Sequence, residues 1–370
     1  MLTRLLPLIA LLACESLEPT RTPESELVLV AADPSDDPIA GLNAHWTARF
    51  AAGDATFEAV FREPEGLGPL FIRASCAGCH AEDGRGPGVV DRAVGVDMAH
   101  GQVLRNRTAA GATTPIEAPE GARIERRLPL AVFGRGYIDA VTDNAIRAQA
   151  ARQAERGGPI RGIVPMVGDA IGRYGVKSRI ASLEDFVADA YVADMGISSS
   201  MRPDELANPD GLTDDGKLGA DIDQATIEVT ADYVRLLAIP PRTLPSGSGE
   251  ALFETTGCTE CHTPSLPTRA DYPIPQLRDI AAPIYSDLLL HDMGPELADG
   301  IDENLATGQH FRTAPLLGLR HLRAYLHDGR AETVEAAIRA HSGEAESARR
   351  AFEALGASDR RALVSFVEAL

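Results

Sequence analysis

Two segments of the chain read Cys-x-x-Cys-His, and their residues are Cys76, Cys79 and His80 in the first and Cys258, Cys261 and His262 in the second. Two thiols at this spacing add across the vinyl groups of a haem, and the adjacent histidine is delivered to the iron as its proximal ligand. The motif therefore predicts two covalently attached c-type haems.

Paired cysteines have two other common uses. A four-cysteine zinc site that joins both pairs would leave His80 and His262 without a role. A thiol redox pair needs neither the histidine nor a second copy. Haem attachment accounts for all six residues, and the fifth cysteine, Cys14, lies in the N-terminal segment, so none remains for a structural disulfide.

The two motifs belong to an internal repeat. Residues 68–80 read GPLFIRASCAGCH and residues 250–262 read EALFETTGCTECH, with Leu, Phe, both cysteines and the histidine at a constant offset of 182 (76 to 258). We expect a short helix before each motif, over 54–62 and 249–256. We also expect a closing amphipathic helix after each, over 224–239 and 358–370.

A helix, a haem motif and a closing helix form the plan of a small cytochrome c domain. The sequence thus predicts a mainly α fold with two class I cytochrome c-like domains. The first, over 41–245, carries a long loop-rich insertion, and the second covers 246–370. A Pro-, Gly- and Ser-rich linker over 242–248 joins them.

The second haem needs a distal partner, and His341 is the first candidate. It continues the apolar stripe of Val334, Ala337 and Ile338 at helical spacing. Met293 is the alternative, followed by His291 in the same segment. A methionine ligand would raise the reduction potential relative to histidine, so the choice affects function.

The distal side of the first haem is less defined. Met98 and His100 follow the first motif in a glycine-containing loop, and either residue could cap the iron. The candidates for a distal acid or base are the carboxylates of the following region, namely Asp139, Asp143, Glu184 and Asp185. The run over 204–223 contains oxygen ligands that suit calcium but not the order of a known calcium loop, so a solvated loop is favoured over a calcium site.

The N-terminus indicates export. Residues 1–14 read MLTRLLPLIALLAC, with a basic Arg4 followed by a short apolar region, which predicts a signal peptide. The last four residues resemble a bacterial lipobox, in which Cys14 is lipidated and anchors the protein in the periplasm or cell envelope; an ordinary secretory signal is the alternative. Residues 15–40 are rich in Pro, Glu and Asp and predict a flexible tether.

Composition limits the partners. The 370 residues are 44% apolar, enough for about two domains. Acidic residues outnumber basic ones by 54 to 35, for a formal charge of −19, so a nucleic-acid partner is excluded and a steered protein partner should be basic. No apolar run approaches the roughly 18 residues that span a bilayer, so membrane contact is expected only through the N-terminal anchor.

Several segments carry a family resemblance. They read GLGPLFIRASCAGCHAEDGRG (66–86), YSDLLLHDMG (285–294), FRTAPLLGLR (311–320) and YLHDGRAETVEAAIRAHSGEA (325–345). Together they resemble the bacterial di-haem oxidoreductase (thiol-oxidoreductase-like) family, a branch of the di-haem cytochrome c peroxidase and MauG superfamily. The resemblance implies that peroxide is reduced at the N-terminal haem, that the C-terminal haem relays electrons, and that His341 occupies the position of the relatives' distal ligand.

The chain also departs from those relatives. They carry a tryptophan between the haems, whereas Trp46 precedes the first motif, so Tyr137 or Tyr233 would have to serve as an aromatic relay. Their distal glutamate has no clear counterpart, and Asp139 is the residue we consider for that role.

Two classes of function follow. The first is a peroxidase that takes electrons from a small basic cytochrome or cupredoxin and uses H2O2 as its substrate, with Asp139 or His100 moving protons; oxidation of a partner protein is a variant of it. The second is a non-enzymatic, lipid-anchored di-haem electron carrier, which a permanently bound His100 or Met98 would favour. Haem-based sensing is a third possibility.

Overall fold

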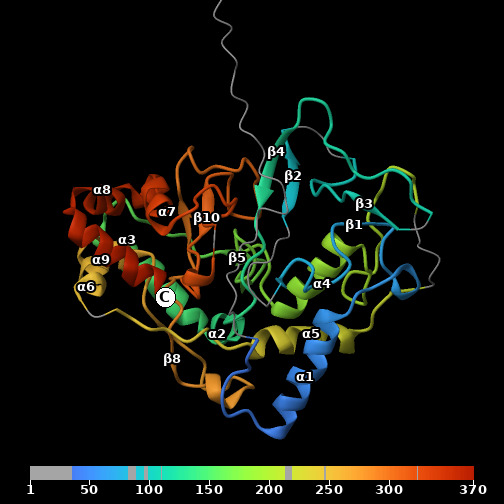
Figure 1. The fold of residues 1–370 in the computed structure, drawn as a ribbon, viewed down its shortest axis with the longest axis horizontal. Helices are drawn as coiled ribbons and strands as arrows, with labels where there is room; N and C mark the ends of the chain where they lie inside the picture. The colour runs from blue at the N-terminus through green and yellow to red at the C-terminus, as the bar shows by residue number, and fades with distance from the viewer. Residues whose placement is uncertain are drawn as a thin grey trace, which may run out of the picture.

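The computed structural model describes residues 36–81, 89–95, 99–109, 111–212, 219–245, 247–322 and 324–370. The expected signal peptide, Cys14, most of the tether and Met98 lie outside these residues. The described chain consists of helices, short two-stranded ribbons and long connecting loops (Figure 1), which confirms the mainly α class. Within it, no helix combines the length and the apolar character needed to cross a membrane.

The helices are α1 (Ala44–Glu58), α2 (Arg135–Ala140), α3 (Asp143–Arg156), α4 (Leu183–Met195), α5 (Gln224–Leu236), α6 (Gly249–Thr255), α7 (Val334–Ala340), α8 (Glu346–Ala354) and α9 (Ala357–Glu368). Side chains of the preceding residues cap several of them. Asn43 caps α1, Asp223 caps α5 and Thr333 caps α7, each by accepting a hydrogen bond from a backbone N–H of the first turn.

The strands are β1 (Leu70–Phe71), β2 (Val90–Val94), β3 (Arg107–Thr108), β4 (Arg123–Arg127), β5 (Met166–Val167), β6 (Ala170–Ile171), β7 (Leu266–Pro267), β8 (Ala281–Ala282), β9 (Leu290–Asp292) and β10 (His310–Arg312). They pair antiparallel as β1–β3, β2–β4, β5–β6, β7–β8 and β9–β10. In the last pair, Arg312 lies opposite Leu290.

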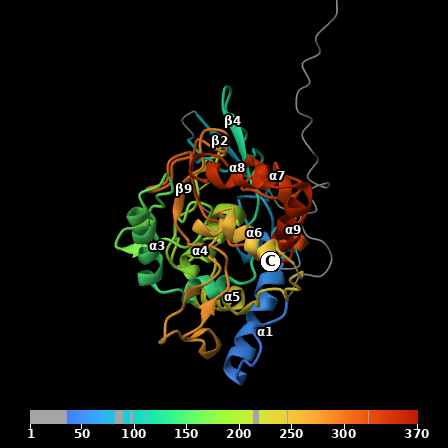
Figure 2. The ribbon, with the colours of Figure 1, turned by 90° about the vertical axis from the view of Figure 1, so that its left-hand side faces the viewer.

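A close helix crossing is found in each half of the described chain. Helix α1 packs on α5, and α6 packs on α9. In Figure 1 the α6 and α9 pair lies at the left edge of the molecule and the α1 and α5 pair at its bottom, and Figure 2 shows the molecule from the α6 and α9 side. A glycine lies at each crossing. A Cβ at Gly53 would come within 2.5 Å of the Cβ of Tyr233, and one at Gly249 within 2.6 Å of the Cβ of Phe366. The helices therefore approach so closely only because these residues have no side chain.

The closing helices match the prediction to within a few residues, but the first helix does not. It was expected over 54–62 and runs from Ala44 to Glu58, because Asn43 accepts a hydrogen bond from the backbone N–H of Trp46 and starts the helix ten residues earlier. Phe71, which the repeat aligns with Phe253, lies in β1 instead of a helix.

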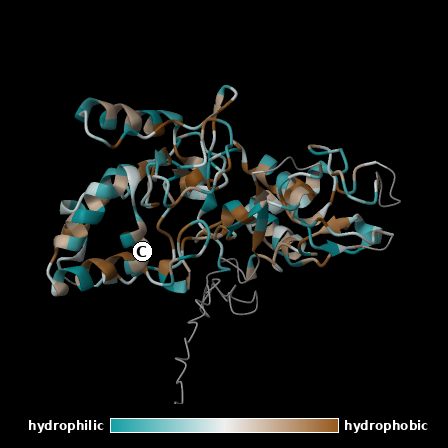
Figure 3. Ribbon diagram, turned by 90° about the horizontal axis from the view of Figure 1, so that it is seen from above, coloured by the Kyte–Doolittle hydropathy of each residue, from teal (hydrophilic) through white to brown (hydrophobic). Residues whose placement is uncertain are grey.

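Apolar side chains of the two halves share cores. One cluster joins Ile138 and Ile146 of the first half to Ile284 and Leu289 of the second. Another joins Leu236 at the end of α5 to a group from the second half, namely Tyr272, Ile274 and Leu277. Figure 3 shows that most of the helices carry both hydrophilic and hydrophobic residues along their length. The two halves are therefore packed against one another rather than joined by a linker alone.

Candidate haem sites

The two Cys-x-x-Cys-His motifs adopt the same local fold. The backbone N–H of the histidine donates to the carbonyl of the first cysteine, at 2.8 Å for His80 and 2.9 Å for His262. A phenylalanine from the preceding helix packs near each histidine, with ring centres 6.2 Å apart for Phe57 and 6.4 Å apart for Phe253. All four cysteines are free thiols. Each motif thus presents two thiols and one imidazole on a single turn, as covalent haem attachment requires.

Each motif opens into its own cavity, which we call the N-terminal and the C-terminal cavity. The N-terminal cavity has a volume of about 250 Å³ and is lined by Cys76, Cys79 and His80 together with residues of α4. The C-terminal cavity has a volume of about 230 Å³ and is lined by Cys258, Cys261 and His262 together with residues of α7 and α9. Both linings are largely apolar, which suits a macrocycle that must be shielded from water.

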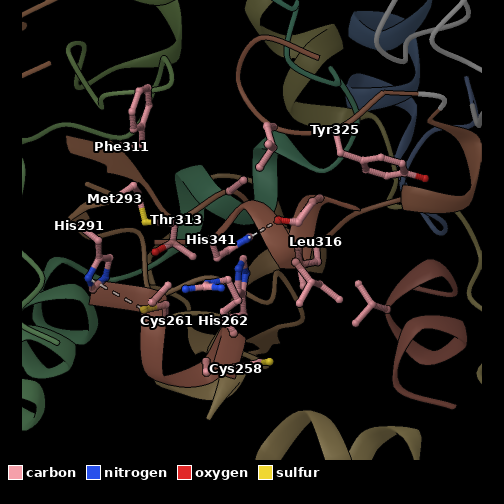
Figure 4. Close-up of a pocket in the computed structure, with 18 of the residues that line it drawn as sticks. Cys258, Cys261, His262, His291, Met293, Phe311, Thr313, Leu316, Tyr325 and His341 are labelled. Atoms are coloured by element: carbon pink, nitrogen blue, oxygen red, sulfur yellow. Dashed lines mark hydrogen bonds between the residues drawn. The ribbon is translucent and has the colours of Figure 1, made fainter. Parts of the chain in front are cut away.

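In the C-terminal cavity a second imidazole faces the motif. The ring centres of His262 and His341 lie 6.5 Å apart (Figure 4). His262 Nδ1 lies 3.1 Å from the carbonyl oxygen of Tyr285, and His341 Nδ1 lies 2.7 Å from that of Ala337. Each Nδ1–H therefore donates to a main-chain carbonyl, which fixes the tautomer and leaves Nε2 as the free ligand atom.

The separation of these rings fits a metal between them. Two metal–nitrogen bonds of about 2 Å each, plus about 1 Å from each nitrogen to its ring centre, place the two centres roughly 6 Å apart. Burial also lowers the pKa of His262 to about 4 and lowers that of His341 below its usual value. Both imidazoles are therefore neutral near pH 7, as metal ligands must be.

His291 lies in the same cavity but in a different chemical state. Its Nε2 lies 3.0 Å from Asp287 and its Nδ1 lies 2.7 Å from Glu344. Although burial alone would lower its pKa, hydrogen bonds to Asp287, Cys261 and Glu344 raise it to about 12. Because both ring nitrogens carry protons that are donated to carboxylates, His291 has no lone pair for a metal.

Two further observations concern metal ligands of the second half. Met293, the alternative distal ligand, lines the C-terminal cavity, and its carbonyl accepts a hydrogen bond from Ser342. Cys261, Asp287 and His291 are the one group of three potential metal ligands within the described residues. That group is already used by the haem motif and by the ion pair of His291.

Three carboxylates in the described part of the run over 204–223 are used locally. Asp210 accepts hydrogen bonds from the backbone of Thr113 and Thr114, and Asp223 caps α5. Asp221 accepts hydrogen bonds from Ser198. These contacts are typical of structural loop carboxylates and do not gather oxygens around a common centre.

Two of the expected residues, Asp139 and His100, do not line the N-terminal cavity. Asp139 accepts hydrogen bonds from the hydroxyls of Tyr174 and Tyr272, at 2.8 and 2.7 Å, and pairs with Arg235 at 3.1 Å. Burial raises the pKa of Asp139, but Arg235 and the hydroxyls outweigh it, and the net shift is downward. Asp139 is thus a structural anion that contacts the lining residue Tyr174 but does not itself line the cavity, and His100 is also absent from the described lining.

One carboxylate that lines the N-terminal cavity, Asp194, was not among the residues expected from the sequence. Asp194, near the end of α4, contributes to the lining beside Asp189. Burial and the nearby Asp189 raise its pKa to about 7. Helical spacing could have indicated this residue, because Val187, Tyr191 and Asp194 lie at i, i+4 and i+7 on one face of α4. Asp143, Glu184 and Asp185 do not line either cavity.

Buried arginines also fit a haem, which carries two propionate carboxylates. The N-terminal cavity is lined by a group of arginines, namely Arg73, Arg92, Arg127, Arg135, Arg179 and Arg312. Burial lowers the pKa of Arg92 and of Arg312, the latter to about 10. Arg92, Arg127 and Arg179 are paired with carboxylates of the fold. Among the other arginines of the lining, Arg312 can provide a counter-charge for bound anions.

Comparison with known proteins shows the family to which the chain belongs. No curated protein matches the chain. A solved structure of hydrazine synthase from Kuenenia stuttgartiensis is similar over 100% of both chains, with 15% sequence identity and a TM-score of 0.44, a likeness too weak to carry an inference. A family model described as "Di-haem oxidoreductase, putative peroxidase" matches residues 119–370, which include the second motif and the C-terminal cavity. With two haem motifs on two matching cavities, the chain belongs to this family of di-haem oxidoreductases.

Proposed function

We propose that the protein is an exported di-haem c-type peroxidase that reduces H2O2 at the N-terminal haem and receives electrons through the C-terminal haem. The observation that carries this proposal is the asymmetry of the two cavities. In the C-terminal cavity His341 faces the proximal His262. In the N-terminal cavity His80 is the one histidine among the described lining residues, and the carboxylate of Asp194 is present instead.

This asymmetry supports a division of labour. His262 and His341 would both hold the C-terminal haem, which would suit it to electron transfer rather than to substrate binding. His80 would hold the N-terminal haem without a second histidine from the described lining, which would leave room for a substrate. When bound, the haem iron supplies the electron chemistry of peroxide cleavage, and the chain attaches it through Cys76 and Cys79.

The protein's own part in the chemistry is proton movement. Reduction of H2O2 to two molecules of water consumes two electrons and two protons, and cleavage of the O–O bond requires a proton on the departing oxygen. Asp194 lines this cavity, and burial beside Asp189 raises its pKa to about 7, so both its charged and its protonated form suit proton transfer near neutral pH. Its carboxylate replaces Asp139 and His100 in this role.

The electrons must come from outside the chain. A small basic cytochrome or cupredoxin suits the net charge of −19, and export through the N-terminal signal with an anchor at Cys14 would place the protein beside such donors in the periplasm. Covalent attachment through both cysteine pairs is part of the same proposal, because exported c-type haems are carried in this way.

One observation favours the electron carrier as a second candidate. Met195, at the end of α4, lines the N-terminal cavity and offers a thioether. If its sulfur occupied the sixth position of the first haem, both haems would be six-coordinate and closed to peroxide.

EPR of the mature protein separates the two functions. Spectra are recorded in the fully ferric and half-reduced states, each with and without H2O2. A high-spin haem, or one that becomes high-spin on half-reduction and reacts with H2O2, is the expected result. Two low-spin haems that do not react with H2O2 in either the ferric or the half-reduced state would show that the protein is an electron carrier instead.

A further inference from the structure

The N-terminal and C-terminal cavities share part of their walls. Leu130, Val176 and Arg312 line both of them. Leu130 and Val176 are apolar, so within the described chain Arg312 is the one polar side chain common to the two linings. It comes from the end of β10, and its backbone N–H donates to the carbonyl of Val176 at 2.8 Å, which joins the second half of the chain to the first.

The guanidinium of Arg312 is buried and has weak partners. The residue is 5% exposed, and its Nε and Nη1 donate to the carbonyls of Gly175 and Thr313, each at 3.3 Å. No carboxylate of the described residues forms an ion pair with it. An arginine has five N–H donors, and a buried cation without an anion is unfavourable by several kcal/mol. An anionic group of a bound molecule would therefore stabilise the buried guanidinium.

Neighbouring buried cations show the contrast. Arg127 pairs with Asp299 at 2.5 Å and with Glu303 at 2.9 Å. Lys177 pairs with Asp299 at 3.0 Å. The fold thus supplies carboxylates for these two cations and none for Arg312, although Arg312 lies where the two cavities meet.

We propose that Arg312 binds a haem propionate at the junction of the two cavities and places one positive charge between the two haems. The proposal rests on the two haems of the proposed function. A guanidinium matches a carboxylate with two parallel hydrogen bonds, so it both orients the propionate and neutralises it. Arg312 is then a positioning residue that both haems share.

The aromatic residues considered for electron relay do not lie between the two cavities. Trp46, Tyr137 and Tyr233 line neither cavity, and no aromatic side chain of the described residues lines both. The residues that the two cavities share are therefore Arg312, Leu130 and Val176, and of these only Arg312 is charged. A cation there stabilises the ferrous state of each haem, because a ferrous haem carries one positive charge fewer than a ferric haem.

Spectroelectrochemistry of Arg312→Gln tests the proposal. Both midpoint potentials should shift to more negative values, each by on the order of tenfold in the ferrous-to-ferric ratio, which is 59 mV for one electron. Arg312→Lys keeps the charge and should restore both potentials toward those of the wild type. Arg349 lines only the C-terminal cavity and is paired with Glu353, so it provides a control, and Arg349→Gln should leave the potential of the N-terminal haem unchanged.

The outcome does not depend on peroxide activity, because the potentials are measured without H2O2. An electron carrier that does not react with H2O2 would still show both shifts in midpoint potential. A failure of the proposed function and a failure of this inference are therefore distinguishable. Should Arg312→Gln not retain two haems, Arg312→Met fills the volume of the arginine stem and carries the same expectation. An uncharged variant with two haems in which only one potential moves, or neither, overturns the proposal.

Discussion

The imidazole rings of His262 and His341 face one another across the C-terminal cavity with their centres 6.5 Å apart and their planes at 56°. Helix α7 ends at Ala340, so His341 is its C-cap residue and its Nδ1 donates back to the carbonyl of Ala337. The end of one short helix therefore fixes the direction of a ligand atom. This placement turns a position on an apolar stripe into a candidate axial ligand.

Replacement of His341 by Ala should convert one ferric haem from low spin to high spin, because it removes the second imidazole and leaves His262 alone. EPR of the ferric protein measures the change, and the signal of the N-terminal haem should stay as it is. Met293→Leu, in the same cavity, is the matched control and should leave both signals unchanged. An unaltered spectrum of His341→Ala would remove His341 from the ligand set.

The cysteine pairs should act independently. The double variant Cys76→Ser and Cys79→Ser should retain one covalent haem per chain, and so should the double variant Cys258→Ser and Cys261→Ser, because each pair has its own cavity. Mass spectrometry under denaturing conditions counts the attached haems. Two haems remaining on either variant would contradict two separate attachment sites.

The repeat was predictable in its chemistry but not in its full extent. The aligned cysteines predicted two related sites, and the alignment paired Phe71 with Phe253. In the structure Phe57 lies against His80 as Phe253 lies against His262. The matching segments are GDATFE at 53–58 and GEALFE at 249–254, offset by 196 (53 to 249) rather than 182. The difference of 14 residues is an insertion between helix and motif in the first copy.

Local periodicity and long-range contacts explain which site residues could be predicted. His341 was found because its stripe lies within one short helix, where spacing alone defines a face. The same reasoning would have found Asp194 on α4. Arg312 could not be found in this way, because its position depends on β10 meeting the loop at Gly175 and Val176, which are about 136 residues earlier in the chain.

Replacement of Asp194 by Asn should slow the reaction with H2O2 by about 10²–10⁴-fold, the range for loss of a proton-transfer group. Because burial and Asp189 raise the pKa of Asp194 to about 7, its carboxyl is protonated below that pH and cannot accept a proton. The wild-type rate should therefore rise as the pH increases through 7, and the variant should lack this step. Stopped-flow mixing with H2O2 across pH 5–9 measures both effects.

Asp139→Asn is the control for Asp194→Asn. It weakens the ion pair with Arg235, so it should lower the stability of the fold but keep the pH step of the reaction with H2O2. A wild-type rate and pH profile in Asp194→Asn would show that another group moves the proton.

Gly249 should not tolerate even a methyl group. A Cβ there would lie 2.6 Å from the Cβ of Phe366 and would also contact the carbonyl of Ala362, so α6 and α9 would have to separate. Alanine favours a helix over glycine by about 1 kcal/mol, but overpacking typically costs about 1–3 kcal/mol. Gly249→Ala should therefore lower the midpoint of urea denaturation, whereas Gly158→Ala, at a site with open space, should leave it nearly unchanged.

Gly249→Ala should also alter the surroundings of the C-terminal haem. Phe253 lies one helical turn after Gly249, and its ring packs between Phe366 and His262, with ring centres 5.6 and 6.4 Å away. A displaced α6 would shift Phe253 and loosen the hold on the proximal imidazole, so the C-terminal haem of Gly249→Ala should show a broadened low-spin EPR signal while the N-terminal haem does not. A destabilised variant with an unchanged low-spin signal would show that the helix crossing supports the fold without positioning His262.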